Sequence, residues 1–188
     1  MMKKRTLSLF VLVAALAVTA VAAARPAGVI QGTAGNDNLT GTPGLDVVYA
    51  KAGDDMVHAL AGNDVIFGGP GNDQLWGNDG NDVVYGSAGN DVLHGGPDGD
   101  LLYGGDGNDT IWGGSGSDHE FGGAGDDTLY SLANDNTPDW LDCGPGNDTA
   151  YVNERKFKLG LEHVARNCER VVLESPDSTL ATQETQDS

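Results

Sequence analysis

Aspartate has the clearest capacity for chemistry in this chain, because it recurs with a period of nine residues. With Gly32 as position one, a frame of nine runs without a gap from residue 32 to residue 130 and makes eleven units. Position six is always an aspartate: Asp37, Asp46, Asp55, Asp64, Asp73, Asp82, Asp91, Asp100, Asp109, Asp118 and Asp127. Paired carboxylates could serve a glycosidase or bind a hard cation. Because these recur with every unit instead of at one unique site, metal ligation is the better interpretation.

The remaining positions of the unit predict a turn followed by a very short strand. Position four is glycine from Gly35 to Gly125, except where the order inverts to Asp98-Gly99. Position eight is aliphatic in every unit but one, which has Glu120: Leu39, Val48, Val57, Ile66, Leu75, Val84, Leu93, Leu102, Ile111 and Leu129. Each unit is therefore a glycine-permitted turn with one acid, then three residues that point outward, inward and outward.

Such units must stack to be stable, and stacking also brings their aspartates together. Strands about 4.8 Å apart can pair as parallel ladders and pool their aliphatic residues into a narrow core. Like carboxylates at that spacing repel one another. Lys51 is the one lysine or arginine between residues 32 and 130. The counter-charge must come from outside, and a divalent cation that prefers carboxylate and carbonyl oxygens meets the need.

The units GGPGNDQLW and GGDGNDTIW resemble the GGxGxDxUx nonapeptide of the RTX proteins, a calcium-binding repeat of parallel β-solenoids. The resemblance covers residues 32–151. It implies an all-β fold, a right-handed parallel β-roll in which two nonapeptides make one coil. It also implies multiple Ca²⁺ ions, each between the turns of repeats n and n+2, in roughly nine such pairings. The implied ligands are the position-six carboxylates and backbone carbonyls of the turns.

Residues 131–151 hold two degenerate or terminal repeats. If Ser131, Leu132 and Ala133 are an insertion, NDNTPDWLD places Asp139 at position six, and CGPGNDTAY follows with Asp148. The resemblance adds Asp148 to the implied calcium ligands.

Several units depart from the pattern. Ala50 and Ala59 replace the first glycine of their units. Lys51 places its positive charge beside a turn that is expected to bind a cation. A buried carboxylate is costly, so we expect Glu120 to lie at a distorted, wetter rung or to rotate outward. We expect Asp98-Gly99 to re-aim one turn.

The composition restricts the partners. There are 28 acidic and 10 basic residues, a formal charge of −18, with 29 glycines. Residues 1–24 have a basic start, an apolar run and the ending Ala22-Ala23-Ala24, which predicts a secretory signal peptide rather than a membrane anchor. Without its three bases, 7 bases face 28 acids and the net charge is −21. Such a chain repels nucleic acid and anionic lipid. Low hydrophobicity and high charge also suit disorder, but the regular repeat argues against it.

The repeats require a cover at their end, because an open rung invites aggregation. Residues 152–176 are predicted to form a C-terminal cap, with apolar positions such as Phe157, Leu159 and Val171, and with five bases that suit an acidic roll. Residues 177–188 have no pattern and are predicted to be a disordered tail.

Cys143 and Cys168 are the two cysteines of the chain. In an exported protein such a pair predicts a disulfide, which would close a loop of about 26 residues and stabilise the fold by roughly 3 to 4 kcal/mol. A zinc site is the rival, but suitably spaced third and fourth ligands are missing from the sequence.

The function expected from these features is that of a secreted, non-catalytic calcium-binding β-roll that folds on binding calcium. The sequence has neither H-E-x-x-H nor G-x-S-x-G. The alternatives are a calcium-dependent surface adhesin or glycan-binding module, and an accessory to a separate secreted enzyme. An N-terminal leader argues for general secretion, with the periplasm, the cell surface or the medium as destination; polysaccharide or protein of the cell envelope is a possible partner.

Position nine predicts two rows of outward rings at about 4.8 Å spacing. One row contains Tyr49, Phe67, Tyr85, Tyr103 and Phe121, and the other contains Thr40, His58, Trp76, His94, Trp112 and Tyr130. These rows either stabilise the sheets by cross-strand packing or form a docking surface.

Overall fold

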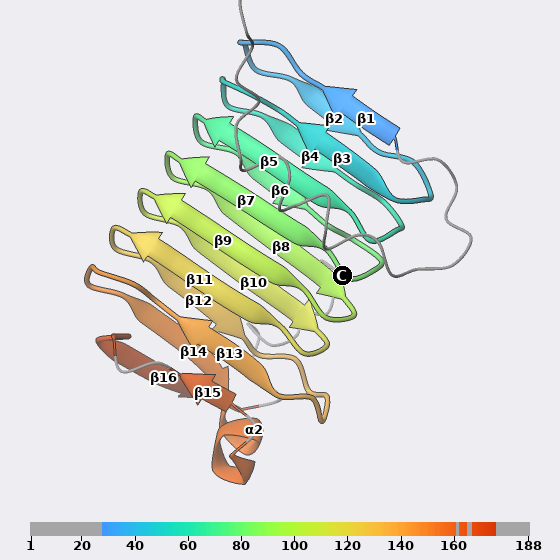
Figure 1. Cartoon of the computed structure of the whole chain (residues 1–188). Helices are drawn as coiled ribbons and strands as arrows, with labels where there is room; N and C mark the ends of the chain where they lie inside the picture. Colours follow the sequence, from blue (N-terminus) through green and yellow to red (C-terminus); the bar gives the residue numbers. More distant parts are fainter. Residues whose placement is uncertain (1–27, 161, 165–166, 176–188) are drawn as a thin grey trace, which may run out of the picture.

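In the computed structural model, the protein is a parallel β-solenoid of two facing sheets, and residues 28–160, 162–164 and 167–175 are described. Figure 1 shows the strands stacked along one axis, with α2 (Glu154–Leu159) at the C-terminal end. The predicted signal peptide (residues 1–24) and tail (residues 177–188) lie outside the described residues. Most of the predicted cap (residues 152–176) is described. The all-β solenoid predicted from the repeats is confirmed.

Each sheet has eight strands, and the chain alternates between the two sheets. The first sheet contains β1 (Gly28–Gln31), β3 (Asp46–Tyr49), β5 (Val65–Pro70), β7 (Val83–Ala88), β9 (Leu101–Asp106), β11 (His119–Ala124), β13 (Asp139–Asp142) and β15 (Glu162–Val164). The second contains β2 (Asn38–Thr40), β4 (Met56–His58), β6 (Gln74–Trp76), β8 (Val92–Pro97), β10 (Thr110–Ser115), β12 (Thr128–Ser131), β14 (Thr149–Asn153) and β16 (Arg170–Glu174). Two nonapeptides therefore make one coil.

The register follows the repeat of 18 residues per coil and changes at two places: after Tyr130, and again around α2, where Asp139 pairs with Glu162. Val47 pairs with Val65, whereas His119 pairs with Trp140, so partners 18 residues apart become partners 21 residues apart. The same shift pairs Thr128 with Thr149 on the other sheet. Three extra residues after Tyr130 are therefore absorbed in one longer turn, and Asp139 and Asp148 resume position six.

The core is a narrow column between the sheets, made by the inward position-eight side chains. Val48, Ile66, Val84 and Leu102 fill it from one sheet, and Val57, Leu75, Leu93, Ile111 and Leu129 fill it from the other; all are fully buried. Each coil contributes two such residues, one from each sheet, so it depends on the neighbouring coils to bury them.

Glu120 contradicts its prediction, because its side chain points into this column and is fully buried. It pairs in register with Leu102 on one side and Leu141 on the other. Alternation along the strand explains the orientation: turning Glu120 outward would turn the neighbouring side chains of His119 and Phe121 inward. The ladder fixes the direction of the side chain even where burial of a carboxyl group is costly.

The C-terminal segment differs from the expected apolar cover. It adds β15 to one sheet and β16 to the other, and it places α2 between β14 and β15 in the chain. Phe157, Leu159, Val171 and Leu173 remain exposed. The end of the solenoid is thus extended by further rungs instead of being covered by these side chains.

The predicted disulfide is confirmed, with Cys143 and Cys168 bonded and their Cα atoms 5.2 Å apart. It joins the turn after β13 to the segment before β16, and both cysteines are buried. In the described part of the chain, there is also no helix long and apolar enough to cross a membrane.

Candidate metal sites in the turns

The turns lie in two columns, one at each edge of the sheets, and every turn carries its aspartate on the inner side. The first aspartate column contains Asp37, Asp55, Asp73, Asp91, Asp109, Asp127 and Asp148, each directly before a strand of the second sheet. The second aspartate column contains Asp46, Asp64, Asp82, Asp100, Asp118 and Asp139, at the strands of the first sheet. All except Asp37 are buried. The structure therefore brings all twelve predicted ligands into two rows, and adds Asp139.

A left-handed backbone at position four lets one turn stack on the next. Gly71 has a φ of 142°, and a Cβ atom there would lie 1.9 Å from the carbonyl oxygen of Gly53 in the turn above. Asp98 takes the same conformation, with a φ of 76°. Aspartate tolerates that region because it is short and polar. The backbone N–H of Gly99 still donates to Asn81 at 3.2 Å, as in the regular turns, so the expected re-aiming of this turn is not seen.

From Asp55 to Asp148, one oxygen of each position-six carboxylate links neighbouring coils. It accepts a hydrogen bond from the backbone N–H of the aspartate one coil earlier, as Asp100 does from Asp82 at 2.8 Å. Eleven such bonds, 2.7 to 3.0 Å long, run along the two columns. The aspartates therefore satisfy backbone donors inside the turns as well as carrying charge.

The second oxygen is buried without a hydrogen-bond donor in ten of these aspartates: Asp46, Asp55, Asp64, Asp73, Asp82, Asp91, Asp100, Asp109, Asp127 and Asp148. At position one of the unit, glycine leaves space beside this oxygen. A Cβ atom on Gly104 would lie 2.3 Å from Asp109 Oδ2 and 2.4 Å from the carbonyl oxygen of Gly122. A carboxylate and a backbone carbonyl thus converge on the same point in successive coils. Buried oxygens without donors are the groups that a hard cation satisfies.

The comparisons with known proteins bear directly on these turns. The family model of the RTX calcium-binding nonapeptide repeat matches residues 28–57, 58–93, 85–120, 94–129 and 121–150. The chain belongs to this family. The matches span both aspartate columns up to Asp148, so the RTX repeats form the observed solenoid. A search of curated proteins found no match.

The oxygens fit calcium in kind, although the carboxylates cannot hold it alone. Within residues 28–160, 162–164 and 167–175, no three His, Cys, Asp or Glu side chains gather around one point. Calcium takes six to eight oxygen ligands, so backbone carbonyls of the turns must supply most of them in this RTX protein. The carbonyls that face the position-one glycines are in place to do so.

Burial raises the pKa of most of these aspartates, and neighbouring carboxylates add to the effect. In the second column the pKa is raised from 3.8 to about 6 at Asp64, about 8 at Asp82 and about 10 at Asp100. In the first column it is raised to about 6 at Asp73 and about 7 at Asp91. The hydrogen bond from the preceding backbone N–H opposes the shift without cancelling it. The folded turns therefore disfavour the ionised carboxylates unless a cation is bound.

The first two units give their aspartates local protein donors, although Asp46 Oδ1 still has no hydrogen-bond donor. Asp37 accepts from the backbone N–H and the hydroxyl of Thr33, and Asp46 Oδ2 accepts from the backbone N–H of Thr42. In the next two units the buried Ala50 and Ala59 place a methyl group at position one, where the regular units have the space that glycine leaves. Lys51 donates to the carbonyl oxygen of Gly32. These N-terminal turns are therefore less suited to a cation than the regular turns that follow.

Two acidic residues in the turns were not predicted as site residues. Glu169 accepts from the backbone N–H of Asp148 at 2.9 Å and so takes the place of the next aspartate in the first column. Glu120 places Oε1 2.6 Å from where a Cβ atom of Gly113 would lie, and Asp118 Oδ2 is 2.9 Å from the same point. Glu169 lies 21 residues after Asp148, a spacing that the 18-residue coil does not predict, and Glu120 was treated as a defect of the core.

The two aromatic rows predicted from position nine are confirmed. Ring centroids lie 4.8 to 5.1 Å apart along Tyr49, Phe67, Tyr85, Tyr103 and Phe121. On the other sheet, they lie 3.7 to 6.1 Å apart along His58, Trp76, His94, Trp112, Tyr130 and Tyr151. A third, shorter row follows position seven, where Trp140 stacks on His163 and packs at a tilt against His119. Both outer faces therefore present half-buried rings.

Proposed function

We propose that this RTX protein is a secreted, non-catalytic calcium-binding β-roll that folds when it binds several Ca²⁺ ions. The observation that carries the proposal is the set of ten buried carboxylate oxygens without donors, each in a turn lined by backbone carbonyls. Calcium would offset the repulsion along each column and satisfy these oxygens at once. The carboxylates recur in every coil, which suits repeated ion binding better than catalysis at one site.

The proposed ligands are the position-six aspartates with the carbonyls of the same and neighbouring turns. They are Asp37, Asp46, Asp55, Asp64, Asp73, Asp82, Asp91, Asp100, Asp109, Asp118, Asp127 and Asp148. The regular turns from Asp73 to Asp127 are expected to bind most strongly, because glycine at position one leaves their oxygens accessible to an ion.

Removing calcium is expected to unfold most of the repeat region, because many glycines must be ordered and the buried carboxylates then lack a counter-charge. Far-ultraviolet circular dichroism should show little β-structure in chelator and a cooperative gain at millimolar Ca²⁺. Magnesium at equal concentration is the control, and should substitute poorly because it demands tight octahedral geometry. Full β-structure in chelator at neutral pH would refute the proposal.

Secretion is supported by the basic and apolar leader at residues 1–24, and the disulfide suits an oxidising compartment. The RTX repeat is compatible with the medium, the cell surface or the periplasm as the final location. An accessory role beside a separate secreted enzyme remains the alternative use of the same fold.

A second candidate function, calcium-dependent attachment to polysaccharide, is favoured by the stacked rings on the outer faces. Trp76 and Trp112 flank His94 in the row on the second sheet. Flat aromatic surfaces suit the apolar faces of sugar rings, but the same stacking also stabilises sheets.

Replacing Trp76 and Trp112 together with threonine separates the two roles of the row. If the row binds glycan, the variant should fold with calcium yet lose at least about 90 % of its binding to insoluble cellulose, chitin or peptidoglycan, since rings carry such contacts. Replacing Tyr85 and Tyr103 with threonine on the opposite face is the matched control. If both variants bind the polysaccharides as well as the unaltered protein does, the row does not bind glycan and only stabilises the sheet.

A further inference from the structure

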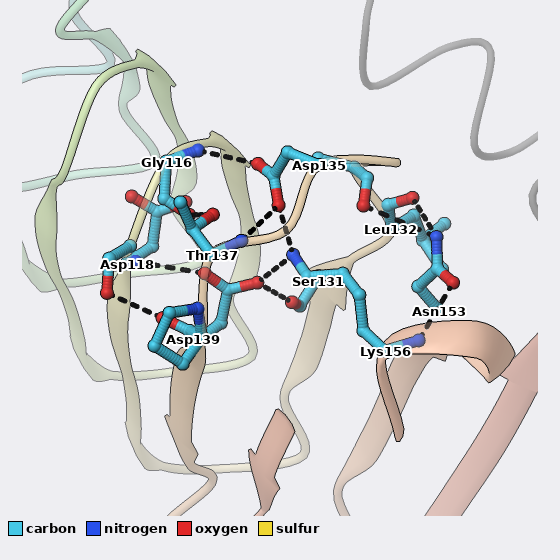
Figure 2. Close-up of polar contacts among 12 residues, drawn as sticks. Gly116, Asp118, Ser131, Leu132, Asp135, Thr137, Asp139, Asn153 and Lys156 are labelled. Atoms are coloured by element: carbon cyan, nitrogen blue, oxygen red, sulfur yellow. Dashed lines mark hydrogen bonds and ion pairs between the residues drawn. The ribbon is translucent and has the colours of Figure 1, made fainter. Parts of the chain in front are cut away.

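The longer turn at residues 131–138 and helix α2 together close the second aspartate column (Figure 2). Asn153 caps the helix by accepting from the backbone N–H groups of Arg155 at 3.0 Å and Lys156 at 3.3 Å. Its side-chain amide donates to the carbonyl oxygens of Leu132 at 3.1 Å and Ala133 at 3.3 Å. This one residue therefore fixes the first turn of α2 against the inserted residues.

The fixed helix directs the side chain of Lys156 inward, where it is 1 % exposed. Its ammonium nitrogen lies 2.6 Å from Asp139 Oδ2 and 3.0 Å from Asp135 Oδ1. Asp139 is the last position-six aspartate of the second column, and its Oδ1 accepts from the backbone N–H of Asp118 at 3.0 Å. The ammonium therefore reaches the one oxygen of Asp139 that this inter-coil bond leaves available.

This oxygen corresponds to the one that has no donor in the regular turns. At Asp139 it accepts from Lys156 and also from the hydroxyl of Ser131 at 2.7 Å. Ser131 directly follows Tyr130 at position nine, where the regular units have the glycine of the next repeat. Protein groups thus satisfy here the atom that elsewhere is suited to a metal ion.

Asp135 supplies a second carboxylate to the same cation from within the insertion. Its Oδ2 accepts from the backbone N–H of Gly116 at 2.9 Å, which ties the longer turn to the preceding coil. Burial would raise the pKa of Asp135, but hydrogen bonds from Thr137, Gly116 and Lys156 outweigh it and hold the pKa below its ordinary value. A lysine so deeply buried requires partners of this kind.

We propose that the ammonium group of Lys156 is the resident cation of the last inter-turn position in the second aspartate column, in place of a calcium ion. The turn that contains Asp139 then holds its counter-charge covalently, and the local stability of that turn does not depend on calcium. This inference rests on the proposed function for the contrast with the regular turns.

Hydrogen exchange measured by mass spectrometry on the full mature chain, in chelator and in calcium, tests the assignment. In the unaltered protein, protection of residues 131–142 should change less than about tenfold between the two conditions, whereas that of residues 60–110 should fall roughly 100-fold or more in chelator. In Lys156→Met, protection of residues 131–142 should become calcium-dependent or be lost. Lys158→Met is the matched control, because that exposed lysine pairs with Glu154 on the same helix.

The double variant Asp139→Asn with Lys156→Met separates charge from packing. If the lysine acts as a counter-ion, removing both charges should restore protection of residues 131–142 in chelator, even where the single variant fails to fold there. The inference is overturned if Lys156→Met behaves like Lys158→Met, if the double variant gains nothing, or if residues 131–142 of the unaltered protein depend on calcium as strongly as residues 60–110. If residues 60–110 keep their protection in chelator, that result counts against the proposed function instead. The comparison of Lys156→Met with Lys158→Met can still be interpreted in that case.

Discussion

Lowering the pH is expected to replace calcium in part, so that calcium-free protein gains β-structure between pH 8 and pH 5. Burial first, and neighbouring carboxylates second, raise the folded-state pKa from the ordinary 3.8 to about 8 at Asp82 and about 7 at Asp91. A raised carboxyl pKa means that the folded state binds protons that the unfolded state does not. Its stabilising effect is complete below the ordinary value and is lost as the pH rises through the raised values.

Circular dichroism on protein stripped of calcium over a chelating resin measures this effect at pH 8, 7, 6 and 5. Sedimentation at each pH should establish that the gain is folding of single chains and not association. With calcium present the trend should reverse, since protons compete for the same carboxylates. No gain of β-structure at pH 5, or a gain confined to aggregates, would contradict the pKa shifts on which the prediction rests.

Asp100→Asn is expected to have opposite effects with and without calcium. Asp100 accepts from the backbone N–H of Asp82 at 2.8 Å, and an amide oxygen can keep that bond. A Cβ atom on Gly95 would lie 2.4 Å from both Asp100 Oδ2 and the carbonyl oxygen of Gly113, so an amide nitrogen in place of Oδ2 would lie next to the space that this acceptor also borders. Removing this buried charge should stabilise the calcium-free roll, while losing a ligand should raise the calcium concentration at the folding midpoint roughly tenfold.

Urea denaturation in chelator at pH 6 and calcium titration at pH 7.5 measure the two effects. Asp98→Asn is the matched control, because it removes the same charge two residues away from an exposed side chain. Its stability and calcium midpoint should change little. If Asp100→Asn and Asp98→Asn respond alike, the position-six aspartate is not a calcium ligand of special importance.

The sequence by itself determined the periodic part of this protein. Glycine at position four, aspartate at position six and an aliphatic residue at position eight recur with one spacing, and each coil contacts its neighbours in the same way. The two-sheet solenoid, the inward core from Val48 to Leu129 and the two aspartate columns follow from that local rule. The aromatic rows follow from it too, because identical strands in register place identical positions above one another.

Only the tertiary structure decided the positions where the rule is broken. Glu120 was expected to avoid the core, yet the register imposed by both neighbouring strands holds it inside. Glu169 completes the first column through a shift of 21 residues, and Lys156 reaches Asp139 from a helix 17 residues further along the chain. The contacts of Glu169 and Lys156 join the last repeats to the segment around α2, where the nine-residue repeat has ended, so the repeat period does not predict them. They depend on how this non-repetitive segment packs against the last coils.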